Sequence, residues 1–164
     1  MPAQEIEQTL TYKINDMKKG VDFIGVTCAF YCHDGKGNIL LQKRSQACRD
    51  EQGRWDSGAG SMEFGEENFE SVVRREINEE LCVDPISVTH VATTNIIREY
   101  DGKTTHWIGL VHVALLPEGS GDVGEPHKID EIAWFAHNEL PDNLHSVFDR
   151  HFALVRDHII HQQD

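Results

Sequence analysis

The chain has 164 residues, and its 15 Lys and Arg are outnumbered by 28 Asp and Glu, which gives a formal net charge of −13. This length fits a single domain over residues 1–164. Hydrophobic residues make up 39% of the chain, enough for a packed core, so disordered, collagen-like and coiled-coil proteins are excluded. The acidic balance also excludes a general nucleic-acid binder, because such a protein needs a basic face.

The cysteines and the N-terminal residues indicate where in the cell the protein is expected and whether it contacts a membrane. The four cysteines form no C-x-x-C pair, which disfavours a zinc site. Residues 1–19 are polar, and no apolar run approaches the roughly 18 residues that cross a bilayer. We therefore expect a cytoplasmic protein with no membrane partner and with reduced cysteines, which are Cys28, Cys32, Cys48 and Cys82.

Hydrophobic patterning and turn residues predict the order of strands and helices. The predicted strands are residues 23–32, 39–43, 88–100, 104–116 and 131–135, and the predicted helices are residues 68–81 and 144–161. This order predicts an α/β protein, an α/β/α sandwich in which a mixed β-sheet lies between the two helices. The chain contains neither a GxGxxG nor a GxxxxGK[ST] motif, so dinucleotide-binding and P-loop folds are excluded.

Acidic residues in the first predicted helix fall along its apolar face rather than opposite it. On a helical wheel that starts at Phe69, with about 100° per residue, three glutamates converge along and beside the apolar stripe: Glu76, Glu79 and Glu80. Like charges at this spacing destabilise one another, so a cation is expected among them. Carboxylate oxygens are the ligands that Mg²⁺ or Mn²⁺ prefers, and the helix therefore predicts a metal site.

The segment around this helix resembles a known sequence signature. Residues 60–83 resemble the Nudix box, G-x5-E-x7-R-E-U-x-E-E-x-G-U, in which U is a bulky aliphatic residue. Residues 75–81 match its second half position by position, and the first half is matched by Gly60, Glu63, Gly65 and Glu66. The chain is thus similar to the Nudix hydrolase family, with a resemblance that covers about residues 20–160.

Two departures from the box are visible. The halves are one residue out of register, which we interpret as one extra residue at the start of the helix; counting back from Arg75 would instead select Ser61 and Glu67. Cys82 replaces the last glycine of the box, and because a cysteine disfavours the left-handed conformation, the exit of the helix is expected to differ.

The resemblance implies hydrolysis of a nucleoside diphosphate derivative, with Mg²⁺ or Mn²⁺ held by glutamates of the box. It implies Glu79 and Glu80 as primary ligands, Glu76 beside them and the backbone carbonyl of Gly60 as a further ligand. Arg75 is expected to orient these carboxylates through Glu66 or Glu67, or to form only a local pair with Glu79.

The general base and the substrate contacts are less specified. The base is either a glutamate of the box or Glu125 in the loop 124–127, for which a solvated loop charge is the alternative. Arg98 and Trp107 are candidates to stack on the base of a small nucleotide substrate, although each fits equally well in a sheet. The sequence leaves a homodimer open.

The expected function is therefore metal-dependent cleavage of the diphosphate linkage in a nucleoside triphosphate, a nucleotide sugar or a dinucleotide. One alternative is a non-catalytic Nudix module that binds a nucleotide, although such modules usually lose the box glutamates. The other is an enzyme similar to isopentenyl-diphosphate isomerase, which would need a reactive cysteine where this chain has Gly60 and Ser61.

Overall fold

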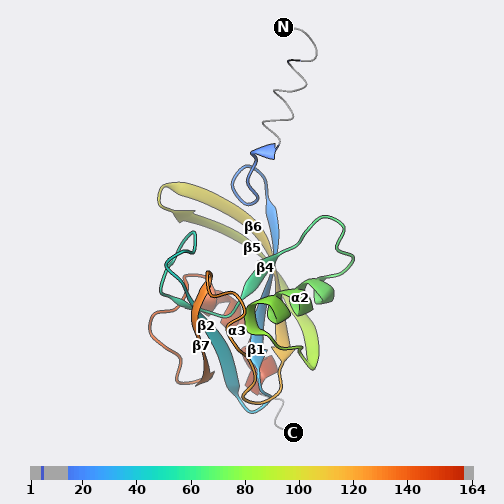
Figure 1. The fold of residues 1–164 in the computed structure, drawn as a ribbon, viewed down its shortest axis with the longest axis vertical. Coiled ribbons are helices and arrows are strands. Elements are labelled where there is room, and N and C mark those ends of the chain that lie inside the picture. Colours follow the sequence, from blue (N-terminus) through green and yellow to red (C-terminus); the bar gives the residue numbers. More distant parts are fainter. Residues whose placement is uncertain (1–4, 6–14, 161–164) are drawn as a thin grey trace.

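The computed structural model describes residue 5 and residues 15–160, and its centre is a seven-stranded sheet with the order β3-β2-β1-β6-β5 (Figure 1). Two further strands join this path, since β4 pairs with β1 and β7 pairs with β2. The strands are β1 (Gly25–His33), β2 (Asn38–Arg44), β3 (Trp55–Asp56), β4 (Ala59–Ser61), β5 (Ser87–Tyr100), β6 (Lys103–Leu115) and β7 (Ile129–Ala136). The helices are α2 (Phe69–Leu81) and α3 (Phe148–Ile160).

Strand β1 organises the sheet and makes it mixed. It runs parallel to β6 over its whole length, from the pair Gly25–Trp107 to the pair His33–Leu115. It is antiparallel to β2 only at its end, where Cys32 faces Leu40 and His33 faces Ile39. Its first half is instead paired with β4. The two hairpin strands β1 and β2 therefore diverge, and β4 carries the glycine-rich segment into the space beside β1.

The two helices cover opposite faces of the sheet, α2 in front and α3 behind in Figure 1. Side chains of β1 alternate between the faces, as the two-residue period of a strand requires. Cys28, Phe30 and Cys32 pack with the apolar side of α2, whereas Tyr31 packs with Phe148 and other residues of α3. The predicted α/β sandwich with a mixed sheet between two helices is confirmed.

The long β5–β6 hairpin extends away from the helices (Figure 1). Its tight turn is the predicted Asp101-Gly102 pair, whose φ angles of 50° and 70° are the left-handed values that such two-residue turns need. Within the described residues, no helix is long and apolar enough to cross a membrane.

Helix α3 begins later than the sequence pattern predicts. Residues 144–147 are not helical, because Leu144 pairs with Trp55 in a β-bridge and the backbone N–H of His145 donates to the Trp55 carbonyl at 2.8 Å. The prediction of a helix from residue 144 is therefore wrong at its start. The predicted last residue, 161, lies outside the described part of the chain.

Helix α2 begins where predicted but ends in an unexpected way. The side chain of Asn68 caps its first turn by accepting a hydrogen bond from the Ser71 N–H at 2.9 Å. Its last cap, Cys82, takes the left-handed conformation with φ 54° and ψ 34°, as a glycine at this position would. The expectation that Cys82 would change the exit of the helix is wrong. The cysteine adopts the left-handed conformation although its Cβ makes that conformation unfavourable.

We predict that Cys82→Gly stabilises the domain, because glycine adopts the left-handed conformation without a Cβ clash. The free energy of unfolding should increase by about 1 kcal/mol, measured by urea denaturation. Cys82→Ala is the matched control, since it removes the thiol and keeps the Cβ. Equal stability of the two variants would contradict strain at this cap.

Candidate active site

Two glutamates of α2 lie on the side of the helix that faces the sheet. Glu76 is 7% exposed and Glu80 is 4% exposed, and they lie among the buried residues Val73, Ile77 and Leu81. The side chain of Glu79 is 48% exposed, so two of the three glutamates predicted along and beside the apolar stripe are buried and the third is about half exposed. Phe69, the first residue of the helix, is also exposed.

The buried position of Glu76 depends on Gly60. A Cβ on Gly60 would lie 2.0 Å from the Glu76 carboxyl carbon, so any larger residue in β4 would displace that carboxylate. The Gly60 carbonyl accepts a hydrogen bond from the Thr27 hydroxyl at 3.3 Å. The glycine predicted from the box therefore lies directly against a box glutamate.

Arg75 connects the carboxylates on this side of α2. Its guanidinium donates to Glu66 at 2.9 Å, to Glu76 at 2.7 Å and to Glu79 at 3.3 Å. The partner from the first half of the box is therefore Glu66, as expected from one extra residue at the start of the helix. The local pair with Glu79 is present as well, so both interpretations of Arg75 hold together.

Burial sets the protonation of the inner carboxylates. Desolvation raises the pKa of Glu80 to about 8, although Gln42 donates to its carboxylate at 3.1 Å. Desolvation also raises the pKa of Glu76, against the opposing effect of Arg75. At neutral pH the metal-free protein thus keeps Glu80 largely protonated.

A loop after β6 docks on the C-terminal end of α2. The N–H of Gly124 donates to the Glu80 carbonyl at 2.9 Å, and the N–H of Asp122 donates to the Leu81 carbonyl at 2.9 Å. Gly124 fits only because it lacks a Cβ, which would lie 2.0 Å from the Glu79 carbonyl oxygen. This docking places the candidate base Glu125 near the glutamates, where its charge contributes to the raised pKa of Glu80.

Glu125 is not a free loop charge. Its carboxylate forms an ion pair with Lys128 at 2.8 Å, and its side chain is only 20% exposed. Lys128 in turn acts on both Glu76 and Glu80 and lowers their pKa values against the effect of burial. The sequence did not single out this lysine.

The described residues contain no group of three or more His, Cys, Asp or Glu side chains arranged to hold a metal ion. One nitrogen of Arg75 lies between the carboxylates of Glu76 and Glu79 and contacts both, so these two oxygens are turned toward the guanidinium. The predicted ligand set of Gly60, Glu76, Glu79 and Glu80 stays a prediction.

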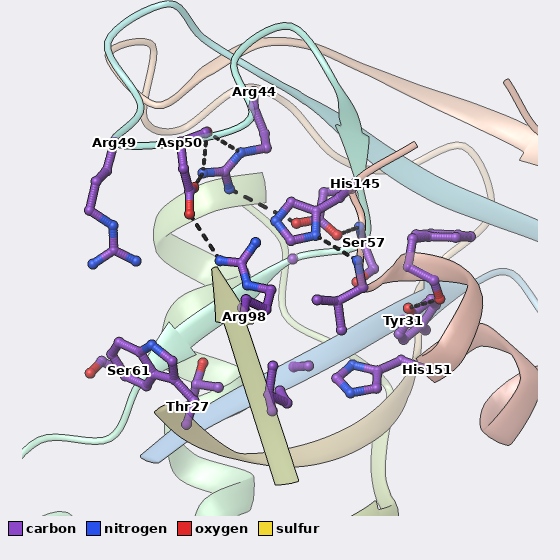
Figure 2. Close-up of a pocket in the computed structure, with 18 residues that line it drawn as sticks. Thr27, Tyr31, Arg44, Arg49, Asp50, Ser57, Ser61, Arg98, His145 and His151 are labelled. Atoms are coloured by element: carbon purple, nitrogen blue, oxygen red, sulfur yellow. Dashed lines mark hydrogen bonds and ion pairs between the residues drawn. The ribbon is translucent and has the colours of Figure 1, made fainter. Parts of the chain in front are cut away.

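A cavity of about 260 Å³ lies on the other face of the sheet, beside β4 and α3 (Figure 2). Both predicted base-stacking residues, Arg98 and Trp107, line it. The Trp107 ring occupies the space that side chains at Gly20 and Gly25 would need, since a Cβ at either position would lie 2.2 or 2.4 Å from the ring.

Arg98 is held by an ionic network that the sequence did not predict. It pairs with Asp50 at 2.9 Å and with Glu51 at 2.6 Å, while Arg44 pairs with Asp50 at 2.7 Å and His145 with Glu51 at 2.8 Å. Figure 2 shows Arg44, Asp50 and Arg98 in one connected row above the cavity. Burial opposes ionisation of both acids. Arg44 and Arg98 outweigh it at Asp50, and the hydrogen bond from the Ser146 N–H, together with His145 and Arg98, outweighs it at Glu51, so the pKa of each carboxyl lies below its usual value.

This network joins the irregular loop 45–54, strand β5 and the segment before α3, so it shapes one wall of the cavity. The only hint in the sequence is the density of charge in residues 44–54.

The fold is an α/β/α sandwich in which the glutamates of α2 lie beside Gly60 of β4. Comparisons with known proteins place this arrangement in one family. The chain matches the NUDIX domain model over residues 23–156 and belongs to the Nudix family. No curated protein matches it.

Three solved structures are similar. A MutT NUDIX hydrolase from Burkholderia pseudomallei is 29% identical with a TM-score of 0.70, over 81% of this chain and 98% of that chain. The NUDIX domain of Shewanella oneidensis NrtR, complexed with ADP ribose, is 16% identical with a TM-score of 0.67, over 91% and 97%. The MutT protein from Methanosarcina mazei Go1 is 20% identical with a TM-score of 0.67, over 82% and 95%.

The raised pKa of Glu80 predicts a pH dependence of stability. Between the ordinary carboxyl pKa of 4.5 and the folded value of about 8, the folded protein holds a proton that the unfolded chain has lost, so stability falls as pH rises through this window. Glu80→Gln does not lose stability in this way, because the amide does not titrate. In urea denaturation with EDTA, the free energy of unfolding of the variant minus that of the wild type should increase by a few kcal/mol from pH 5 to pH 8. One pKa unit corresponds to about 1.4 kcal/mol. A constant difference across this range would contradict the assignment.

Proposed function

We propose that this protein is a divalent-metal-dependent hydrolase that cleaves the diphosphate linkage of a nucleoside diphosphate derivative. The observation that carries the proposal is the pair of buried carboxylates, Glu76 and Glu80, on the sheet side of α2. Two acidic groups in an apolar layer destabilise a fold unless a cation compensates them. Family membership and the 29% identity to a MutT NUDIX hydrolase support the same class of reaction.

The residues present fit Mg²⁺ or Mn²⁺. The donors are all oxygen atoms, from Glu76, Glu79, Glu80 and the Gly60 carbonyl, which suits hard cations. Gln42 Oε1, on the side chain that donates to Glu80, is buried without a hydrogen-bond partner among the described residues. When bound, the ion would supply charge neutralisation for the phosphoryl oxygens and lower the pKa of the attacking water.

The other residues have positioning and proton-transfer roles in this proposal. Arg75 holds Glu66, Glu76 and Glu79 as one unit and so orients the carboxylates. Glu125 is the candidate base outside the helix, and its ion pair with Lys128 at 2.8 Å holds its carboxylate in place. The alternative general base is a glutamate of the Nudix box. Glu125→Gln distinguishes the two assignments, because it removes activity only if Glu125 is the base.

A second candidate function is a nucleotide-binding module without catalysis. The observation in its favour is the similarity of fold to the NrtR NUDIX domain, whose structure contains ADP ribose. The retention of Arg75, Glu76, Glu79 and Glu80 favours the hydrolase. Product release distinguishes the two functions.

The experiment is a panel of nucleoside triphosphates, nucleotide sugars, ADP-ribose and dinucleoside polyphosphates, each with Mg²⁺ and with EDTA. We expect hydrolysis only with the metal, and a loss of at least 100-fold in kcat for Glu80→Gln, because the amide keeps the shape and loses the charge. Glu70→Gln is the matched control, since Glu70 lies on the exposed side of α2 and, among the described residues, pairs only with Arg74.

Hydrolysis by the wild type in EDTA would contradict the metal requirement. Equal activity of Glu80→Gln and Glu70→Gln would contradict the role of Glu80. Binding of a nucleotide without turnover of any member of the panel would favour the binding module.

A further inference from the structure

We infer that a pair of histidines on neighbouring strands, His90 on β5 and His112 on β6, binds one transition-metal ion of the Zn²⁺ type. This site is separate from the glutamates of α2, and it goes beyond the proposed function. Imidazole nitrogen is a preferred ligand of Zn²⁺, whereas Mg²⁺ prefers oxygen ligands, so the two sites differ in the ion that they select.

The two rings are neighbours because the register of the sheet sets them opposite each other. His90 is the partner of His112 in the antiparallel pairing of β5 with β6. Their ring centroids are 5.2 Å apart, with an angle of 61° between the ring planes. Two imidazoles that share a tetrahedral ion have centroids about 5 Å apart, since each metal–nitrogen bond is about 2.0 Å long. The observed spacing therefore suits a shared ion.

His112 has an unused lone pair. Its Nδ1–H donates to the Leu110 carbonyl at 2.9 Å and to the Ala29 carbonyl at 3.3 Å. Because a carbonyl oxygen can only accept, Nδ1 carries the hydrogen and Nε2 of the neutral ring keeps its lone pair. Nε2 is buried without a hydrogen-bond partner among the described residues. Metal-bound histidines commonly donate their other ring N–H to a backbone carbonyl in this way.

A purely structural role does not account for this histidine. The residue is 1% exposed, and an unpaired acceptor at such a position destabilises the fold. An apolar ring would fill the same space without this effect. Burial lowers the pKa of His112, and the neighbouring His90 lowers it further. The imidazole is therefore neutral at pH 7, which is the form that binds a metal ion.

A β-bulge positions His90 on the edge strand. The register of β5 against β6 shifts between His90 and Ala92, so Val91 is an extra residue in β5. The consecutive residues Val91 and Ala92 both pack with the cluster under α3 as a result. Thr93 then lies on the same side of the strand as His90, and its hydroxyl oxygen is 3.3 Å from His90 Nε2. Bulges commonly re-aim a side chain beside a functional site.

The pair is accessible and lies apart from the acidic helix. His90 is exposed and packs edge-on with His112, so a change of its rotamer opens a path to the buried ring. The described residues hold no group of three or more His, Cys, Asp or Glu side chains for a metal, so water completes the coordination. The glutamates of α2 instead meet β4 and β2, through Gly60 and Gln42.

The test is a calorimetric titration with ZnCl₂ in excess Mg²⁺. We expect His90→Gln to weaken Zn²⁺ binding tenfold or more, because one of the two protein ligands is lost. His90 is exposed, so this variant keeps the fold. His158→Gln is the matched control, since His158 is an exposed histidine of α3 far along the chain, and it should bind as the wild type does. Equal Zn²⁺ affinity of the two variants would overturn the inference.

Two further measurements identify the ligands and do not depend on hydrolysis. Glu80→Gln should bind Zn²⁺ with unchanged affinity; loss of binding in this variant would assign the ion to the acidic helix and overturn the inference. In nitrogen NMR spectra of isotope-labelled histidines, Zn²⁺ should shift the Nε2 signal of His112. Binding that leaves this signal unchanged would also overturn the inference.

Discussion

The structure depends on one arrangement, the burial of two carboxylates of α2 against the sheet. Glu76 and Glu80 occupy positions that an ordinary amphipathic helix fills with apolar residues, and they remain there because three other features accommodate them. Gly60 leaves the space for one, Gln42 hydrogen-bonds the other, and Arg75 balances the charge on the outer side. Burial raises the pKa of both acids, so the metal-free fold holds a strained, partly protonated site.

The sheet is built to bring this site close to a cavity on its opposite face. Because β1 pairs with β2 only near Cys32 and His33, β4 can enter beside its first half. Successive residues of β4 then face opposite sides, so Gly60 contacts Glu76 while Ser61 lines the cavity. The cavity wall itself is fixed by the ion pairs of Arg98 with Asp50 and Glu51, which connect distant parts of the chain.

The sequence predicts the helix and its glutamates well because their period and spacing are local. It also predicts that β5 and β6 form a hairpin, because the Asp101-Gly102 turn that joins them is a local signal. It fails where tertiary contacts decide. The start of α3 is set by the bridge between Leu144 and Trp55, and the strained cap at Cys82 persists because the surrounding fold holds it. The network around Arg98 joins residues some 47 positions apart, which no local pattern reveals.

The most direct measurement of the central claim is the number of protons released when Mg²⁺ binds, from calorimetry in buffers of different ionisation enthalpy. The pKa of Glu80 is about 8, so this carboxyl is mostly protonated at pH 7 and mostly ionised at pH 9. If the ion displaces this proton, binding should release close to one proton at pH 7 and almost none at pH 9. The account predicts this fall. Mg²⁺ binding with no proton release at either pH would contradict it, because the buried carboxylates would then not be the groups that meet the ion.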